Sequence, residues 1–240
     1  MSDDPFARHR SLLFTVAYEV LGSAADAEDV VQETWLRWAG VDHGEVREPR
    51  AYLVRTVTNQ ALNRLRSVSR RREDYVGEWL PEPLLTAPDV ADDVALADSV
   101  SIAMLTVLET LNPAERAVFV LREAFDAPYE EIAEAVGKSP AAVRQIAHRA
   151  REHVAARRPR VTVAATEQEA VVDRFLAAVR GGDLQGLLDV LAPDVVGIAD
   201  GGGVVAAVRR PIVGADRLAD LLLGVSRLHG VTLEPAWLNG

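Results

Sequence analysis

The sequence predicts a multidomain protein in which two all-α helical domains are followed by a smaller α+β domain. Three observations lead to this prediction. Apolar residues recur at helical spacing through most of the first 156 residues. The stretches 73–95 and 157–167 lack that spacing and are expected to be linkers. Short runs of β-branched residues gather after residue 195. The expected domains are 1–72, 96–158 and 168–240, with 73–95 as an acidic linker.

The first helical domain is expected to hold three helices. Apolar side chains repeat at helical spacing from residue 6, and Gly22-Ser23 ends the run. Ser23 is a suitable N-cap for a second helix over about 24–39, whose first turns carry acids, the sign that a helix N-terminus favours. After a loop, Pro49 opens a third helix over 50–70 with an apolar stripe along one side.

The later elements are predicted from breaks and periodicity in the same way. Proline and glycine breaks delimit helices at 96–111, 113–125, 128–136 and 140–156. The last domain is expected to have helices at 168–180, 183–191 and 214–228, and strands at Val195–Ile198, Val204–Val208 and Val231–Leu233. Helices and strands mixed in this order predict an α+β domain.

Charge is distributed unevenly along the chain. The protein has a net charge of -10, yet residues 47–72 hold eight Arg and a single acid. Residues 138–160 hold Lys138 and six Arg against Glu152, while residues 73–115 hold ten acids and no Lys or Arg. Two positive surfaces on an anionic body favour a polyanion contacted at two places, because each neutralised phosphate releases counterions.

Composition excludes several other classes. No long uncharged apolar run is present, which excludes a membrane-spanning helix, and the N-terminus lacks the apolar core of a signal peptide. The chain has no Cys, so disulfides and thiolate metal sites are excluded. We therefore expect a cytoplasmic protein without a metal or cofactor, and with no membrane partner.

Residues Tyr129–Arg151 carry the strongest local motif. A short helix, a tight turn at Gly137-Lys138-Ser139 and Pro140 at the start of a second helix are typical of a helix-turn-helix. The second helix would turn five residues outward, where Arg reads guanine and Gln reads adenine in a major groove. These are Ala141, Arg144, Gln145, His148 and Arg149. The alternative is an ordinary helical hairpin with solvated arginines.

Two other helices carry polar faces. In the third helix, Asn59 and Asn63 lie four residues apart and share one face, with Arg55, Arg66 and Arg70 beside them. Asparagine suits base edges and arginine suits phosphate, although a solvated basic helix would look the same. The second helix is acidic, which alone indicates a solvated face; its spacing lacks the histidine of a metal site.

Together these segments resemble bacterial sigma factors of the extracytoplasmic-function type. The resemblance covers about residues 1–156. Asp26–Glu33 with Trp35-Leu36-Arg37 is similar to their polymerase-binding helix, and Arg50–Leu53 through Thr58–Arg66 to their promoter-melting helix. Leu111–Arg116, Tyr129–Ala133 and Val143–Arg151 are similar to their C-terminal helix-turn-helix domain.

The resemblance implies the partners and the residues that meet them. The partners are core RNA polymerase, through the clamp helices of its β′ subunit, and promoter DNA. Polymerase contacts would be Asp26, Glu28, Asp29, Gln32, Glu33 and Trp35. The −10 element would meet Asn59, Asn63, Arg64, Arg66 and Arg70, with the asparagines capturing an unstacked base. The −35 element would meet the outward face of the helix-turn-helix.

The C-terminal part narrows the resemblance to the sigma factors that carry a SnoaL-like extension, an α+β fold of the nuclear-transport-factor-2 type. The matching segments are Trp79-Leu80-Pro81-Glu82-Pro83-Leu84 and Asp200-Gly201-Gly202-Gly203. Valines follow the glycines where a basic residue is common, and the chain stops at Gly240 before further family strands, so we expect an incomplete sheet.

We expect the extension to regulate the chain intramolecularly by packing on the DNA-binding domains and on Trp79–Leu84, because this apolar motif lies inside a linker that otherwise has the composition of a solvated segment. A separate anti-sigma factor is then not required. Two alternatives stay open from the residues themselves. One is a free-standing helix-turn-helix regulator with a ligand-sensing domain. The other is an enzyme fused to a DNA-binding domain, although the acids of 168–240 show no nucleophile, base and orienting group in sequence and are typical of caps and turns.

Overall fold

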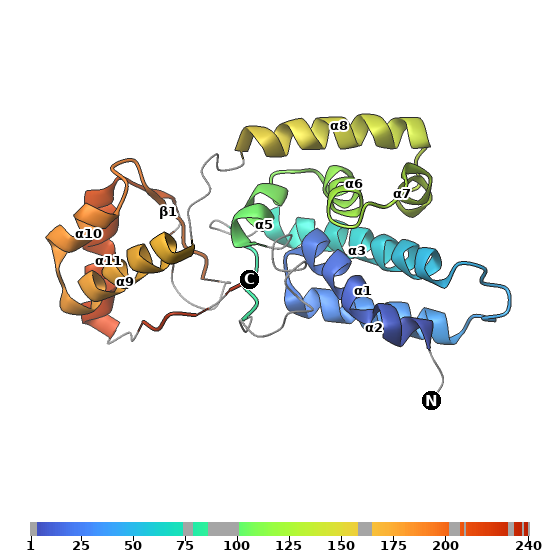
Figure 1. Cartoon of the computed structure of the whole chain (residues 1–240), viewed down its shortest axis with the longest axis horizontal. Helices are drawn as coiled ribbons and strands as arrows, with labels where there is room; N and C mark the ends of the chain where they lie inside the picture. Colours follow the sequence, from blue (N-terminus) through green and yellow to red (C-terminus); the bar gives the residue numbers. More distant parts are fainter. Residues whose placement is uncertain are drawn as a thin grey trace. The chain divides into compact units, whose positions relative to one another are not determined.

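The computed structural model describes residues 4–73, 79–85, 101–157, 165–201, 207–208, 210–229, 233–236 and 238–239. The chain forms two compact units (Figure 1). The first unit comprises Met1–Asp74, Pro81–Arg158 and Trp237–Gly240, and the second comprises Tyr75–Leu80 and Pro159–Ala236. Both helical sets predicted from the sequence therefore belong to the first unit. Residues Pro81–Leu84 of the linker motif Trp79–Leu84 belong to it as well, whereas Trp79 and Leu80 belong to the second unit.

The first helical set consists of α1 (Pro5–Leu21), α2 (Ala24–Ala39) and α3 (Pro49–Glu73), which pack on one another (Figure 1). Helix α1 begins after Asp4, whose carboxylate accepts the Phe6 amide at 3.0 Å, and ends at Gly22 in a left-handed conformation with φ 70°. Ser23 caps α2 by accepting the Asp26 amide at 3.3 Å. The predicted breaks and caps are confirmed here.

The second helical set consists of α5 (Ile102–Leu108), α6 (Pro113–Glu123), α7 (Tyr129–Val136) and α8 (Pro140–Arg157). Asn112 and Glu115 form a reciprocal capping box at the start of α6. Helix α6 contacts α1 and α3, and α7 contacts α3. Apolar side chains of both sets, including Leu13, Val57 and Ile132, form one buried core.

A buried ion pair lies where α6 meets the end of α1. The Arg116 guanidinium donates to the Glu19 carbonyl at 2.7 Å and lies 2.7 Å from the Glu109 carboxylate, with only 2% of its side chain exposed. Gly22 passes so close that a Cβ on it would lie 2.6 Å from the Glu109 carboxylate oxygen. Glycine is needed there both for this approach and for its positive φ.

The second unit consists of α9 (Ala165–Gly181), α10 (Leu184–Val190), β1 (Val196–Gly197), β2 (Ile212–Val213) and α11 (Ala215–His229). The strands pair antiparallel, with Val196 opposite Val213. A small core forms between the helices from Ala178, Val179, Leu187, Ala219 and Leu223. In its described residues the unit is mostly helical with a small two-stranded sheet.

Three predicted elements need correction. The strand predicted at Val204–Val208 is wrong in its described part, because residues 207–208 are not in a strand; the rest lies outside the described residues. The partner of β1 is instead Ile212–Val213, which was not predicted. The helix predicted to reach residue 111 ends at Leu108, because Thr110 and Leu111 donate to Val107 and Leu108 in a tight turn. Of the strand predicted at Val231–Leu233, only Leu233 is described, and it is not in a strand.

Candidate functional site

The turn between α7 and α8 has helix-turn-helix geometry. Gly137 ends α7 with φ 67°, and the Lys138 amide donates back to the Ala133 carbonyl at 3.0 Å. The Ser139 hydroxyl accepts the Ala142 amide at 3.2 Å, and Pro140 occupies the first position of α8. The predicted turn is confirmed, and the direction in which α8 leaves it follows from these local bonds.

Helix α8 has one buried and one exposed face. Val143, Ile146 and Ala147 are buried. The face predicted to read DNA is exposed: Ala141, Arg144, Gln145, His148 and Arg149. An exposed row of hydrogen-bonding side chains on the second helix of such a motif has the form that a major groove accommodates.

The basic side chains on this exposed face have acidic neighbours. Arg144 lies 3.0 Å from the Glu130 carboxylate, His148 lies 3.6 Å from that of Glu152, and Arg149 lies 4.0 Å from Glu115. The side chains of Arg144, His148 and Arg149 are each more than half exposed. Exposed pairs of this kind contribute little to stability, so phosphate groups compete with the carboxylates at small energetic cost.

Helix α3 presents a strip of polar side chains to solvent. Asn59, Asn63 and Arg66 are exposed along it. The Asn59 amide donates to the Arg55 carbonyl at 3.1 Å, and Arg66 donates to the Asn63 side-chain oxygen at 3.1 Å. These bonds order the strip and leave amide groups accessible to a base edge. The Arg70 side chain lies outside the described residues.

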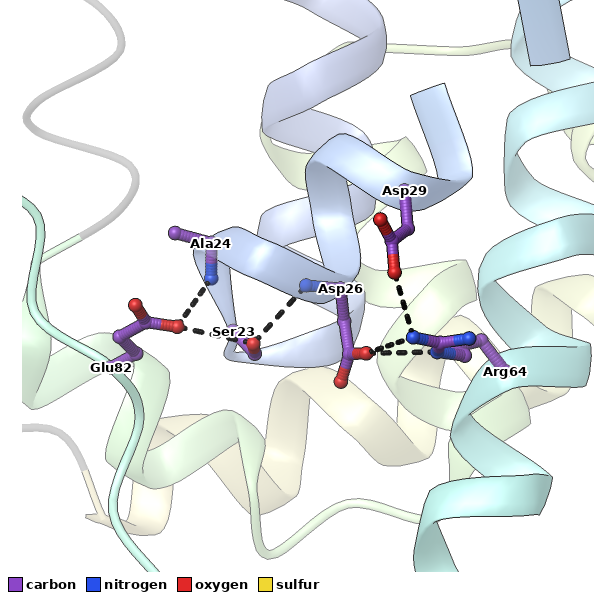
Figure 2. A network of polar contacts seen from close by, with 6 residues as sticks. All are labelled: Ser23, Ala24, Asp26, Asp29, Arg64 and Glu82. Carbon is purple, nitrogen blue, oxygen red and sulfur yellow. Dashed lines mark hydrogen bonds and ion pairs between the residues drawn. The ribbon is translucent and has the colours of Figure 1, made fainter. Parts of the chain in front are cut away.

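Arg64, also on α3, points toward Asp26 and Asp29 of α2 (Figure 2). Its Nε donates to the Asp26 carboxylate at 2.8 Å, and its Nη2 lies 2.6 Å from the same oxygen and 2.9 Å from Asp29. The hydrogen bond with Asp26 raises the pKa of the Arg64 guanidinium, and the opposing effect of burial is smaller. The structure thus brings together residues that the sequence analysis gave to two partners.

The residues of α2 predicted to bind polymerase lie on two flanks. Asp26, Asp29 and Glu33 lie on the flank toward α3, where Gln60 donates to Glu33 at 3.0 Å. On the other flank, Glu28 pairs with Arg10 at 2.7 Å. The side chains of Gln32 and Trp35 line a shallow groove of about 220 Å³ with Phe6, Arg10 and Val31.

One further residue of α2, Leu36, belongs to the motif identified in the sequence but was not among the predicted polymerase contacts. Leu36 is 59% exposed and follows Trp35, which is 45% exposed. Two neighbouring large apolar side chains in water indicate a contact surface. The signal was present in the sequence, because Leu36 falls outside the spacing of the buried positions Val31, Thr34 and Trp38.

The linker motif docks on the start of α2. The Glu82 amide donates to the Gly22 carbonyl at 2.8 Å. The Glu82 carboxylate accepts the Ala24 amide at 2.8 Å and the Ser23 hydroxyl at 3.1 Å (Figure 2). A carboxylate at a helix N-terminus satisfies free backbone donors and is stabilised by the helix dipole. Glu82 therefore holds the linker at the N-terminus of α2.

Asn239 joins this linker to α1. Its backbone amide donates to the Leu84 carbonyl, and its side-chain oxygen accepts the Leu84 amide, each at 2.9 Å. Its side-chain nitrogen donates at 2.8 Å to the Tyr18 hydroxyl, which in turn donates to the Glu82 carbonyl at 2.5 Å. The sequence analysis missed Asn239, which is 1% exposed and has φ 59°. Asparagine before glycine was the local signal for that backbone conformation.

Tyr18 gives this network a pH dependence. Burial raises the pKa of its hydroxyl, more than the hydrogen bond from Asn239 lowers it. The unfolded chain loses the hydroxyl proton from about pH 10, whereas the folded chain keeps it to higher pH. Stability from this group is therefore present below about pH 10 and falls as pH rises. We expect the difference in unfolding free energy between wild type and Tyr18→Phe to shrink over this range; a constant difference from about pH 9 to 11 would contradict the assignment.

In the second unit, Asp200 contacts the other half of the linker motif. Its carboxylate accepts the Leu80 amide at 3.0 Å, and Gly201 beside it is buried. Trp79 is 36% exposed. Gly202 and Gly203, which the sequence analysis grouped with Asp200, lie outside the described residues. A hydrogen bond thus joins Asp200 to the first part of the Trp79–Leu84 motif.

Two kinds of site are absent from the part of the chain that the structure describes. No group of three or more His, Asp or Glu side chains there is arranged to hold a metal ion. Among the helices with described residues, none is both long and apolar enough to cross a membrane.

Comparisons with known proteins agree with this geometry. Residues 6–71 match the family described as Sigma-70 region 2, and residues 101–154 match Sigma-70, region 4. The chain is 39% identical over 248 residues to the ECF RNA polymerase sigma factor SigJ of Mycobacterium tuberculosis, with 100% of this chain and 79% of SigJ covered. The crystal structure of M. tuberculosis extracytoplasmic function sigma factor SigJ matches with a TM-score of 0.79 at 38% identity, covering 98% of this chain and 80% of that one.

Proposed function

Because the chain belongs to the extracytoplasmic-function (ECF) RNA polymerase sigma factors, which direct core polymerase to promoters, we propose how its helices divide that work. Helix α2 binds the clamp helices of the β′ subunit. Helix α3 holds the melted −10 strand, and α8 reads the −35 duplex. The observation that carries this proposal is a pair of exposed polar strips. They are Asn59, Asn63 and Arg66 on α3, and Arg144, Gln145, His148 and Arg149 on α8.

The two strips suit different forms of DNA. The strip on α8 follows a helix-turn-helix, so it enters a duplex groove and reads base edges. The strip on α3 offers two amides four residues apart, which suit the Watson–Crick edge of a base extruded from the stack. Arg66 beside them is suited to the phosphate of the same strand. Because the protein has a net charge of -10, most of its surface repels DNA, and DNA binding is confined to these two strips.

We further propose that residues 168–240 form a SnoaL-like domain that regulates the sigma factor intramolecularly. The supporting contacts are those of the linker: Glu82 at the start of α2, Asn239 on Leu84 and Tyr18, and Asp200 on Leu80. Residues 81–84 of the linker and residues 238–239 thus contact the first unit. Both helical sets share one core in that unit.

The docked state regulates transcription according to the fraction of sigma-factor molecules that occupy it. Promoter elements are separate sites, so the two helical sets must be able to spread on DNA. A free-energy difference of a few kcal/mol between compact and spread states is enough to set the active fraction. A regulator built into the chain makes a separate anti-sigma factor unnecessary. The proposed place of action is the cytoplasm, where core polymerase and promoter DNA are found.

Run-off transcription tests this regulation. Full-length chain and a version lacking residues 168–240 are each added to core polymerase on one promoter. We expect the activities to differ several-fold, since undocking changes the population of the competent state. Glu82→Gln should shift activity in the same direction as the deletion, because the neutral amide is a weaker cap. Asp189→Asn, whose exposed partner Gln185 lies 2.9 Å away, is the matched control. Equal activity of full-length and shortened chains would end the proposal.

The two alternative functions considered from the sequence, an enzyme and a free-standing regulator, predict different experimental results. The family membership sets aside an enzyme, since sigma factors have no catalytic activity of their own. A free-standing regulator would bind duplex DNA unaided, whereas a sigma factor copurifies with core polymerase and recognises the promoter as part of that complex. Copurification in the absence of DNA is the expected result.

A further inference from the structure

Arg64 links the two helices that are proposed to serve polymerase and the −10 strand. We propose that Arg64 is a positioning residue: it holds the asparagine strip of α3 at a fixed rotation against α2 and makes no contact with DNA. This inference rests on the proposed role of Asn59 and Asn63 at the −10 element. It reassigns Arg64 from the predicted set of DNA contacts.

Helix geometry places Arg64 away from the exposed strip. At about 100° per residue, Asn63 and Arg66 lie within about 40° of Asn59 around α3. Arg64 lies about 140° away from Asn59 by the same count, and Gln60 about 100° away. Gln60 is buried and Arg64 is half-buried, whereas Asn59, Asn63 and Arg66 are exposed. A strand lying along the strip would therefore not reach the Arg64 guanidinium.

The Arg64 guanidinium is bound by two carboxylates of α2. Asp26 accepts at 2.8 Å and Asp29 at 2.9 Å, and both carboxylates come from the first turns of α2 (Figure 2). The planar guanidinium fork fixes direction as well as distance, which a lysine ammonium would not do. For a phosphate to bind Arg64, it would have to replace two carboxylates that are already in place.

A second polar contact runs in parallel with the first. Gln60, one turn earlier on α3, donates to Glu33, which lies farther along α2. The two contacts occur in opposite order along the two helices, so α2 and α3 run antiparallel with a polar seam between them. Two separated attachment points resist rotation of α3 about its own axis, which one contact would not.

The arrangement gives Asp26 and Asp29 a role in orienting α3. When polymerase binds α2, the rotation of α3 is set by the same acids, so the asparagines face the melted strand in a defined direction. Loss of Arg64 should then impair strand capture without removing a phosphate contact.

The salt dependence of binding separates the two roles. Wild-type holoenzyme, Arg64→Gln and Arg66→Gln are titrated with single-stranded −10 DNA over a range of salt. Each phosphate contact contributes about 0.7 to the slope of log affinity against log salt for single strands. We expect Arg66→Gln to lower the slope by about that amount. Arg64→Gln should weaken capture about fivefold with an unchanged slope. A slope lowered equally in Arg64→Gln would overturn the proposal.

Two further experiments separate the positioning role from a phosphate contact. Arg64→Lys retains the charge, so a phosphate contact would survive it, whereas a two-carboxylate positioning contact should lose strand capture nearly as in Arg64→Gln. Unfolding of Arg64→Gln, Asp26→Asn and the double variant gives the coupling between the pair. We expect the effects to be clearly non-additive, and additive effects would also overturn the proposal.

The proposed role of the asparagines has its own control. Asn63→Ala should reduce strand capture in the same titration. If it has no effect, the assignment of the −10 strand to α3 fails. If Asn63→Ala is impaired while Arg64→Lys behaves like wild type, the assignment stands and the positioning role fails.

Discussion

Replacing Arg116 with methionine is expected to destabilise the first unit by about 3–5 kcal/mol, because one partner of a buried ion pair is removed. The guanidinium is 2% exposed and lies 2.7 Å from the Glu109 carboxylate. It also donates to the Glu19 carbonyl, 97 residues away in the chain. Methionine has similar length but no donor, so the largely buried Glu109 carboxylate would lose this cation. Urea unfolding of wild type and variant measures the difference.

A matched pair elsewhere in the unit isolates the effect of burial. Arg10 and Glu28 also lie 2.7 Å apart, but about half of each side chain is exposed. Arg10→Met should therefore cost at most about 1 kcal/mol. Adding Glu109→Gln to Arg116→Met should recover much of the lost stability, since the charge left behind is then removed. Equal costs for Arg10→Met and Arg116→Met would contradict this account.

The second large effect is expected at Asn239. Asn239→Ala removes two side-chain hydrogen bonds, one accepting the Leu84 amide and one donating to the Tyr18 hydroxyl. Each contributes about 1 kcal/mol. Alanine in a left-handed conformation adds about 1 kcal/mol more, because φ at this position is 59°. The docked state should thus weaken by about 3 kcal/mol, equivalent to about a hundredfold faster hydrogen exchange at the Leu84 amide.

Two substitutions divide this effect between its causes. Asn239→Gly removes the side chain but suits the backbone conformation, so its effect should be smaller than that of alanine by about 1 kcal/mol. Asn239→Asp keeps an acceptor for the Leu84 amide, but it faces a Tyr18 hydroxyl whose proton is already donated to Glu82. We expect it to weaken docking nearly as much as alanine. Unchanged exchange at Leu84 in Asn239→Ala would show that the segment is held by other contacts.

Local signals in the sequence predicted the helices well, because their caps and breaks involve neighbouring residues. Ser23 caps α2 through an amide three residues on, and Pro140 begins α8 directly after the turn at Gly137. The exposed face of α8 followed from spacing alone, since a helix that buries Val143 and Ile146 must expose Arg144 and Gln145. The strand Ile212–Val213 was missed because two residues have no readable periodicity.

Contacts between distant residues could not be predicted in this way. The rotation of Arg64 away from Asn59 was implied by helical spacing, but its partners Asp26 and Asp29 lie 38 and 35 residues earlier. Asn239 meets Tyr18 across 221 residues, and no pattern in the sequence connects them. In the sequence, nothing distinguishes Arg116 from an exposed arginine, whereas in the structure it is buried and bonded to α1.

The sequence by itself thus determined the family, the order of the helices and the two polar strips, because periodicity, capping and charge are local properties of the chain. Only the tertiary structure decided which charged side chains are bound to partners within the protein. It ties Arg64 to the acids of α2, buries Arg116 beside Glu109, and seats Glu82 on the start of α2. The physical reason is that a charge is committed by whatever lies a few ångströms away in space, and packing brings those neighbours from anywhere in the chain.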